Sequence, residues 1–122
     1  MITGTVNTDL QPLIVVPAFS ASGVRHDIKA LVDTGYNGWL TLPPDLIAAL
    51  GLSWRQRGRA ILADGSTIVF DIYEGTVLWD GALLTILIDE ADGIPLVGMS
   101  LMRGYELNVQ AVDGGSVTIR FP

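Results

Sequence analysis

Glycine recurs along the whole chain, and this spacing constrains the fold more than any other feature of the sequence. The 122 residues include 14 glycines, and the segments between them are short and rich in Val, Ile, Leu and Thr. Residues of these types favour the pleated backbone of β-strands. The sequence therefore predicts a mainly β protein built from short strands.

Nine segments have this composition and are predicted as strands: residues 2–7, 13–19, 26–32, 39–42, 59–63, 67–77, 83–89, 106–112 and 117–121. Two of the turns between them contain residues that tolerate positive φ, Asp64-Gly65 and Asp113-Gly114-Gly115. We predict a hairpin at each of these turns. The spacing of the strands suggests a compact barrel or sandwich.

One segment departs from the β pattern and is predicted as a short helix. Residues 43–51 begin with two prolines and an acid, continue with helix-forming residues and end at Gly51. This order is typical of the start and the end of a helix. Residues 99–103, between two glycines, could form a second helical turn.

The length and composition indicate one domain over residues 1–122, at 13.0 kDa. The net charge of −6 offers no basic surface for nucleic acid or an anionic membrane. With no cysteine and one histidine, the chain lacks disulfide frameworks, thiol nucleophiles and most zinc sites. The apolar runs are too short to span a membrane and the first residues carry no positive signal-peptide start, so we expect a cytoplasmic protein.

Carboxylates and hydroxyls remain for chemistry, and residues 30–35 place both after an apolar segment. In Ala30-Leu31-Val32-Asp33-Thr34-Gly35 an acid follows a predicted strand and precedes a hydroxyl and a glycine. A carboxylate at the mouth of a buried strand needs hydrogen bonds from nearby groups, and glycine lets the backbone turn around it. This arrangement suits acid–base catalysis. An ordinary strand-to-turn junction, with Asp33 as a turn former, is the structural alternative.

Further segments give the motif a context. They are Trp39-Leu40-Thr41-Leu42, the predicted helix ending at Gly51, the predicted hairpin at Ala63-Asp64-Gly65-Ser66, and Ile94-Pro95-Leu96-Val97-Gly98. With this order of elements the sequence resembles the retropepsin-like aspartic proteases, in particular the small single-domain bacterial proteins of that clan. The resemblance covers nearly the whole chain. It implies an all-β retropepsin-like closed barrel with one or two short helices, active as a symmetric homodimer.

The resemblance also implies a catalytic mechanism and its residues. Each subunit of the family supplies one Asp-Thr-Gly loop, so Asp33 of two copies would form a catalytic pair that needs no metal or cofactor. Two close carboxylates share a proton, and the pair activates water for attack on a peptide bond. Thr34 would brace the two loops across the interface, and Gly35 would let the substrate backbone approach.

Other roles transfer to the later segments of the chain. The hairpin at residues 61–68 resembles the flap that closes over an extended peptide substrate. We assign Ala63, Asp64 and Gly65 at its tip, together with Asn37, to substrate binding. Residues 96–98 would pack behind the catalytic loop as support.

The sequence departs from the family pattern at three positions. Viral relatives carry an acid four positions after the catalytic Asp and an Arg after the later glycine, and these two form an ion pair. Here the positions hold Asn37 and Met99, so both charges are missing together, and losing both partners can be nearly neutral. Ser100 stands where a carboxamide or an acid is common.

A second acid of the chain resembles Asp33 in its position in the sequence. Asp89 also follows an apolar run, but Glu90-Ala91 replaces the hydroxyl and glycine, so we interpret Asp89 as an exposed turn residue.

Two other functions stay open: a catalytically silent dimeric domain that binds a peptide by strand addition, and a structural subunit in which Asp33 only turns the chain. Arg55, Arg57 and Arg59 alternate and are expected on one strand face, which is usually solvated. Contact of these three positive charges with an acidic substrate or partner is the alternative.

Overall fold

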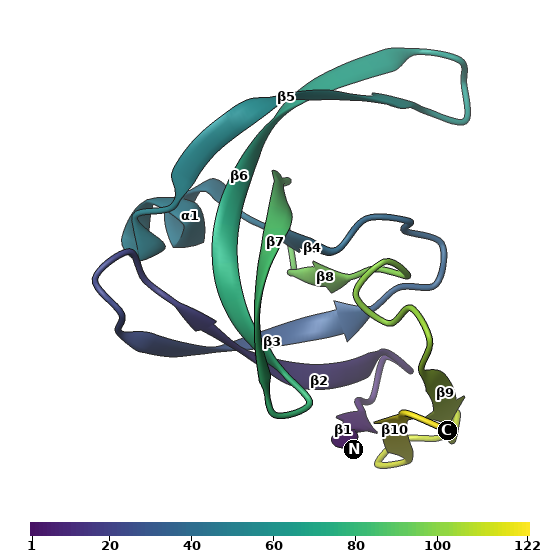
Figure 1. Ribbon diagram of the computed structural model, residues 1–122. Helices are drawn as coiled ribbons and strands as arrows, with labels where there is room; N and C mark the ends of the chain where they lie inside the picture. The colour runs from purple at the N-terminus through teal and green to yellow at the C-terminus, as the bar shows by residue number, and fades with distance from the viewer.

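The computed structural model describes residues 1–122 and consists of ten strands and one short helix (Figure 1). The strands are β1 (Ile2–Val6), β2 (Pro12–Phe19), β3 (Arg25–Val32), β4 (Leu40–Leu42), β5 (Ser53–Ile61), β6 (Thr67–Trp79), β7 (Ala82–Glu90), β8 (Leu96–Val97), β9 (Glu106–Val109) and β10 (Ser116–Arg120). The helix α1 spans Pro44–Leu50. The prediction of a mainly β protein is confirmed. No helix in it is long and apolar enough to cross a lipid bilayer.

All the strands belong to one sheet, in the order β5-β6-β7-β4-β8-β3-β2-β1-β10-β9. An additional pairing joins β2 to β6, where Ala18 lies opposite Val77 and Phe19 opposite Thr76. The strands β6, β7, β4, β8, β3 and β2 therefore form a closed hydrogen-bonded circuit. β5 and β9 stand at the two ends of the order, each with one neighbour.

Alternating side chains of the strands fill one apolar core. In β2 and β3 every second residue is buried: Ile14, Val16, Ala18, Ile28, Ala30 and Val32. This period of two is what a strand with one inward face requires. Full burial of each large aliphatic side chain contributes about 1.5–3 kcal/mol. The core fixes the register of β3, and with it the point at which Asp33 leaves the sheet.

The helix α1 forms where the sequence predicts it. Pro44 occupies its first turn, Asp45 adds an acid there, and Ile47 and Leu50 bury the inner face. Gly51 ends the helix in the left-handed conformation, with φ of 63°, which glycine adopts without a Cβ penalty. The second predicted helical turn, at residues 99–103, is present only as hydrogen-bonded turns over residues 99–104, including a bond of 3.4 Å from the Met102 N–H to the Gly98 oxygen; no second helix forms.

Three strands differ from the prediction. β9 ends at Val109 rather than at residue 112. β5 begins at Ser53 rather than at residue 59, and nearly all of its side chains are exposed, so no inward apolar face marks its first half. β8 was not predicted as a strand, because it has only two residues and follows Pro95. It is nevertheless buried between β3 and β4, and its backbone groups pair with both.

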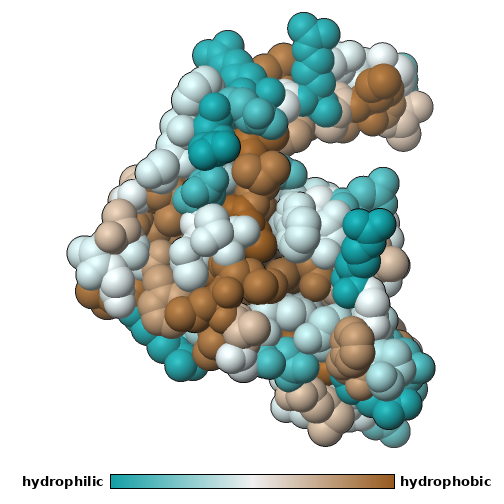
Figure 2. Space-filling view, in the orientation of Figure 1, coloured by the Kyte–Doolittle hydropathy of each residue, from teal (hydrophilic) through white to brown (hydrophobic).

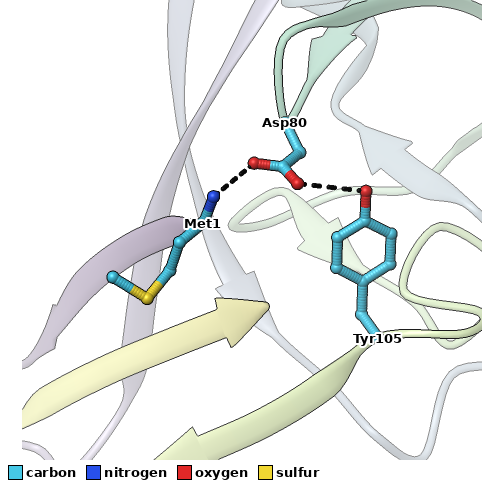
Figure 3. Close-up of polar contacts among 3 residues, drawn as sticks. All are labelled: Met1, Asp80 and Tyr105. Carbon is cyan, nitrogen blue, oxygen red and sulfur yellow. Dashed lines mark hydrogen bonds and ion pairs between the residues drawn. The ribbon is translucent and has the colours of Figure 1, made fainter. Parts of the chain in front are cut away.

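The turn between β6 and β7 connects parts of the chain that are distant in sequence (Figure 3). Asp80 accepts a hydrogen bond of 2.5 Å from the Met1 amino group and one of 3.2 Å from the Tyr105 hydroxyl. The hydrogen bond from the amino group is the main cause that lowers the pKa of the Asp80 carboxyl. Trp79, next to it, is buried, and its ring packs edge-on against Tyr105.

Candidate functional site

The loop that carries Asp33 wraps around the end of a buried strand. β8 pairs parallel with β3 and antiparallel with β4, so it lies between the strand that enters the loop and the strand that leaves it. Residues 33–39 make the connection. Asp33 is the first residue after β3, and its backbone N–H donates a hydrogen bond of 2.9 Å to the oxygen of Val97 in β8.

The Asp33 carboxylate is oriented by its own loop. Its Oδ1 accepts a hydrogen bond of 2.9 Å from the backbone N–H of Gly35, and its second oxygen has no hydrogen bond within the chain. Asp33 is half-buried, whereas Thr34 and Gly35 are exposed. A Cβ on Gly35 would lie 3.2 Å from Oδ1, which is tighter than an ordinary contact. The loop thus presents one carboxylate oxygen that is free to act on a ligand.

The chain after β8 supports this loop from behind. Residues 98–100 donate four hydrogen bonds to backbone oxygens of residues 36–39. They are Gly98 N to Trp39 O at 3.0 Å, Met99 N to Tyr36 O at 2.8 Å, Ser100 N to Gly38 O at 3.1 Å and Ser100 Oγ to Asn37 O at 2.5 Å. The expected packing of residues 96–98 behind the loop is therefore confirmed. One of these supporting contacts comes from the hydroxyl of Ser100.

Close backbone approach explains the glycines on both sides of this contact. A Cβ on Gly98 would lie 2.2 Å from the Gly38 oxygen and 2.6 Å from the Tyr36 ring. A Cβ on Gly38 would lie 2.3 Å from the Tyr36 hydroxyl. All three distances are shorter than any real contact of a Cβ atom, so the two glycines make room for the Tyr36 side chain and for the close approach of the backbone.

Tyr36 connects the loop to β7, a contact that the sequence did not indicate. Its hydroxyl donates a hydrogen bond of 2.6 Å to Asp89 Oδ2. The interpretation of Asp89 as an exposed turn residue is wrong: it lies within β7, is half-buried and faces Tyr36. Burial, and then the bond to Asp89, raise the pKa of the Tyr36 phenol, and burial raises the pKa of the Asp89 carboxyl against the opposing effect of the bond.

A cavity of about 480 Å³ lies beside this pair. Its walls come from the loop at Tyr36, from Thr41 and Pro44, from residues 68–71 and Ala60 of the β5–β6 hairpin, and from residues 89–92 at the end of β7. Its volume is within the range of small-molecule and side-chain binding pockets. The hairpin arches over the rest of the molecule, and Figure 2 shows an open hollow between the two.

The predicted substrate-binding residues lie in two places. Asn37 is exposed in the loop, and Ala63, Asp64 and Gly65 form the exposed hairpin tip, which extends above the loop in Figure 1. The tip is a tight turn in which Gly65 has φ of +84° and Ser66 N donates 2.9 Å to Asp64 Oδ1. None of these four residues lines the cavity. The predicted hairpin at Asp64-Gly65 is confirmed as a structural element.

The three arginines lie on β5, the first strand of the hairpin. Arg55 forms an ion pair of 3.1 Å with Glu74, and Arg57 lies 3.7 Å from Asp71. All three arginine side chains are exposed, as expected. The expectation that they share one face is wrong for Arg55, because a β-bulge between Trp54 and Gln56 interrupts the alternation. Of the tryptophans, only Trp79 belongs to the core, whereas Trp39 and Trp54 are exposed.

Comparison with known proteins finds similarity in structure alone. No family model and no curated protein matches the sequence. The structure is similar to a retropepsin-like aspartic protease from Rickettsia conorii, with 21% identity and a TM-score of 0.60, over 97% of this chain and 87% of that chain. It is also similar to the EIAV protease complexed with the inhibitor HBY-793, with 15% identity and a TM-score of 0.54, over 80% of this chain and 89% of that chain.

Proposed function

The chain has a retropepsin-like fold, and from this premise we propose that it is an aspartic endopeptidase. The observation that carries the proposal is the geometry of Asp33, a half-buried carboxylate at the end of a core strand. One of its oxygens accepts the Gly35 N–H at 2.9 Å and the other is free. A turn-forming Asp on a surface would not need the four backing hydrogen bonds that hold this loop.

The proposed enzyme is a homodimer, because one chain supplies only half of the catalytic pair. Asp89, the other acid that follows an apolar run, lies in β7 and accepts the hydrogen bond of the Tyr36 hydroxyl. Asp33 of a second copy is therefore proposed as the partner. The resulting pair would share one proton, since two adjacent carboxylates do not both ionise readily.

The reaction uses the two carboxyl groups in different protonation states. The ionised carboxylate takes a proton from water as the water oxygen attacks the peptide carbon, while the protonated carboxyl donates its proton to the carbonyl oxygen. Collapse of the tetrahedral intermediate then breaks the carbon–nitrogen bond, with a proton delivered to the leaving amine. No cofactor takes part in this scheme.

The remaining predicted residues have supporting roles in the proposal. Thr34 is exposed beside Asp33 and is proposed to brace the opposing loop through its hydroxyl, while Gly35 leaves room for the substrate backbone. Asn37 and the tip residues Ala63, Asp64 and Gly65 are proposed to contact an extended peptide, with the hairpin acting as a flap. A cytoplasmic site of action stays a prediction from the sequence.

Replacing Asp33 with Asn tests the proposal. The amide keeps the shape of the side chain but cannot act as a general base, so Asp33→Asn is expected to lower peptide turnover by about 10²–10⁴-fold. Cleavage of a diverse peptide library measures the rate, and circular dichroism and sedimentation measure fold and dimer. Asp113→Asn, in an exposed turn, is the matched control. Wild-type turnover in Asp33→Asn would contradict the proposal.

A catalytically silent peptide-binding domain is the second candidate. The observation that favours it is the absence of the viral ion pair, because Asn37 and the exposed Met99 stand at its two positions. This candidate predicts saturable binding of library peptides by the wild-type chain without any cleavage. Cleavage that disappears in Asp33→Asn would exclude it.

A further inference from the structure

The cavity beside Tyr36 combines an apolar wall with several carboxylates. Ala60, Ile68 and Phe70 of the hairpin form the apolar side, and the end of β7 forms the acidic side with Asp89, Glu90 and Asp92. No Lys, Arg or His is among the residues that line it. An opening of this kind has room for a side chain that is apolar along its length and positive at its end.

The acidic residues that line this cavity differ in whether a hydrogen-bond donor or a positive group of the chain already contacts their carboxylates. Asp71 accepts a hydrogen bond from Trp54 Nε1 at 3.0 Å and lies 3.7 Å from Arg57. Glu90 and Asp92 form no ion pair within the chain. Both residues line the cavity, and neither has a counter-ion within the chain.

Asp89 occupies a special position between the loop and the cavity. One of its oxygens accepts the Tyr36 hydroxyl at 2.6 Å, and the ring of Tyr36 is held between Gly38 and Gly98. Asp89 Oδ1 has no hydrogen bond within the chain and is free to accept a donor from a ligand. Because Tyr36 follows Asp33 by three positions, a group bound here lies next to the catalytic loop.

We propose that this cavity is a subsite that receives a Lys or Arg side chain of the peptide substrate; the proposal rests on the endopeptidase function above. The methylene stem packs on Ile68 and Phe70, and the positive end lies among Asp89, Glu90 and Asp92. Long basic side chains bury their stems on apolar surface while the charged end stays near water or a counter-ion. Charge-assisted hydrogen bonds to carboxylates give the discrimination.

The composition of the cavity disfavours other ligands. An acidic side chain would meet like charges, and a purely apolar one would leave the carboxylates next to apolar groups and remove water from them. A bare metal ion does not fit, because no group of three or more His, Cys, Asp or Glu side chains is placed to hold one. A positive group at the end of an apolar stem can pack on the apolar side of the cavity and form charge-assisted hydrogen bonds on its acidic side.

Matched peptides test the subsite. A library digest first identifies cleaved sequences, and one cleaved peptide with Lys at an enriched position is then compared with its Gln and Glu twins. The expected kcat/KM falls about tenfold from Lys to Gln and further for Glu. In the double variant Glu90→Gln, Asp92→Asn, kcat/KM should fall for the Lys peptide and much less for its Gln twin, so that most of the preference for Lys is lost. Asp113→Asn, outside the cavity, should keep the whole preference.

Charge reversal gives the sharper version of the test. Asp92 is exposed in the turn after β7, so Asp92→Lys is expected to fold, and it should shift the preference from the Lys peptide toward the Glu twin. Added salt should weaken the wild-type preference, since screening acts on exposed charges. A library without Lys or Arg enrichment at any position, or equal losses for the Lys and Gln peptides in the double variant, would overturn the subsite.

The same peptides separate this proposal from the proposed function. If no peptide is cleaved, binding is measured instead of cleavage. Fluorescence anisotropy then compares how tightly the wild-type protein binds a labelled pool of Lys peptides and a labelled pool of Gln peptides. Tighter binding of the Lys pool, lost in the double variant, would support the subsite even though the endopeptidase function had failed. Equal binding of both pools would overturn the subsite as well.

Discussion

At the scale of single residues, the pair formed by Tyr36 and Asp89 is the contact that most clearly joins the loop to the rest of the sheet. The two side chains are 53 positions apart and meet at 2.6 Å. Both are partly buried, and for both groups burial is the main cause of the raised pKa. The charged form of Asp89 is thus disfavoured in the folded chain, although the hydrogen bond from Tyr36 offsets part of this effect.

This shift predicts how stability depends on pH. A raised pKa means that folded Asp89 holds its proton more tightly than the unfolded chain, whose ordinary value is 3.8. The contribution of Asp89 to the free energy of unfolding therefore falls as pH rises from the unfolded pKa through the folded one. Asp89→Asn has no such titration, so its stability relative to wild type should improve as pH rises above 3.8.

Urea unfolding of both proteins at equal concentration measures the difference. Asp113→Asn removes one negative charge in an exposed turn away from Tyr36 and corrects for the change in net charge. A relative stability of Asp89→Asn that is constant, or that worsens as pH rises, would show that Asp89 is not disfavoured as an ion.

The sequence predicted the position of Asp33 at the end of a strand but not the surroundings of Asp89, and the reason is the range of the interactions. Asp33 owes its conformation to Gly35 and Tyr36, which are neighbours in the chain. Asp89 has the same apolar segment before it, but its partner lies in another part of the sequence. A local pattern contains the first kind of contact and not the second.

At the scale of elements, the β5–β6 hairpin divides into two parts with different surroundings. Residues 61–69, around the tip, are all exposed, whereas Ile72, Val77 and Trp79 of the same β6 strand belong to the buried part of the chain. The outer part therefore contributes little to the core, and a change there is expected to act locally. This is the behaviour required of a segment that closes over a ligand.

A comparison of two glycines tests this division. Gly65 at the tip and Gly51 after α1 both have positive φ, where a side chain costs about 1–2 kcal/mol. Gly65→Val is expected to lower kcat/KM about tenfold and to shift Tm by less than about 2 °C, because the tip can distort without the core. Gly51→Ala should lower Tm by about 3–6 °C and leave kcat/KM within about twofold.

The reverse pattern would contradict a role of the hairpin in substrate binding. If Gly65→Val lowered Tm as much as Gly51→Ala and left turnover unchanged, the hairpin would be a structural element. Peptide cleavage and thermal unfolding on the same samples give both numbers.

The elements that the sequence missed share a physical cause. β8 and the first half of β5 carry no periodic apolar pattern, since β8 is too short for one and β5 is exposed on both faces. Their conformation comes from pairing with β3, β4 and β6. The segments with a buried face, such as β2 and β3, were predicted within a residue at each end.

At the scale of the whole molecule, the sheet places a single Asp-Thr-Gly loop on each chain. The circuit closed by the pairing of β2 with β6 holds the loop between β3 and β4, and the hairpin extends from the same circuit (Figure 1). The mostly β architecture followed from the sequence. The order of the strands did not, because it depends on pairings between distant segments.

A site built from one loop per chain predicts that inactive subunits poison active ones. If the catalytic pair takes one Asp33 from each copy, a dimer of wild type and Asp33→Asn has a single ionisable carboxylate and should be nearly inactive. Under random exchange the active fraction falls as the square of the wild-type fraction, so equal mixing leaves about a quarter of the activity of undiluted wild type. A site within one chain would leave about half.

Activity is measured against mixing ratio after subunit exchange has been confirmed with differently tagged chains, with Asp113→Asn mixed in the same way as the control. Dilution of wild type below the dimer dissociation constant should lower specific activity for the same reason. A straight line through the half-activity point would mean that each chain works alone, and the shared pair would have to be abandoned even though the fold is retropepsin-like.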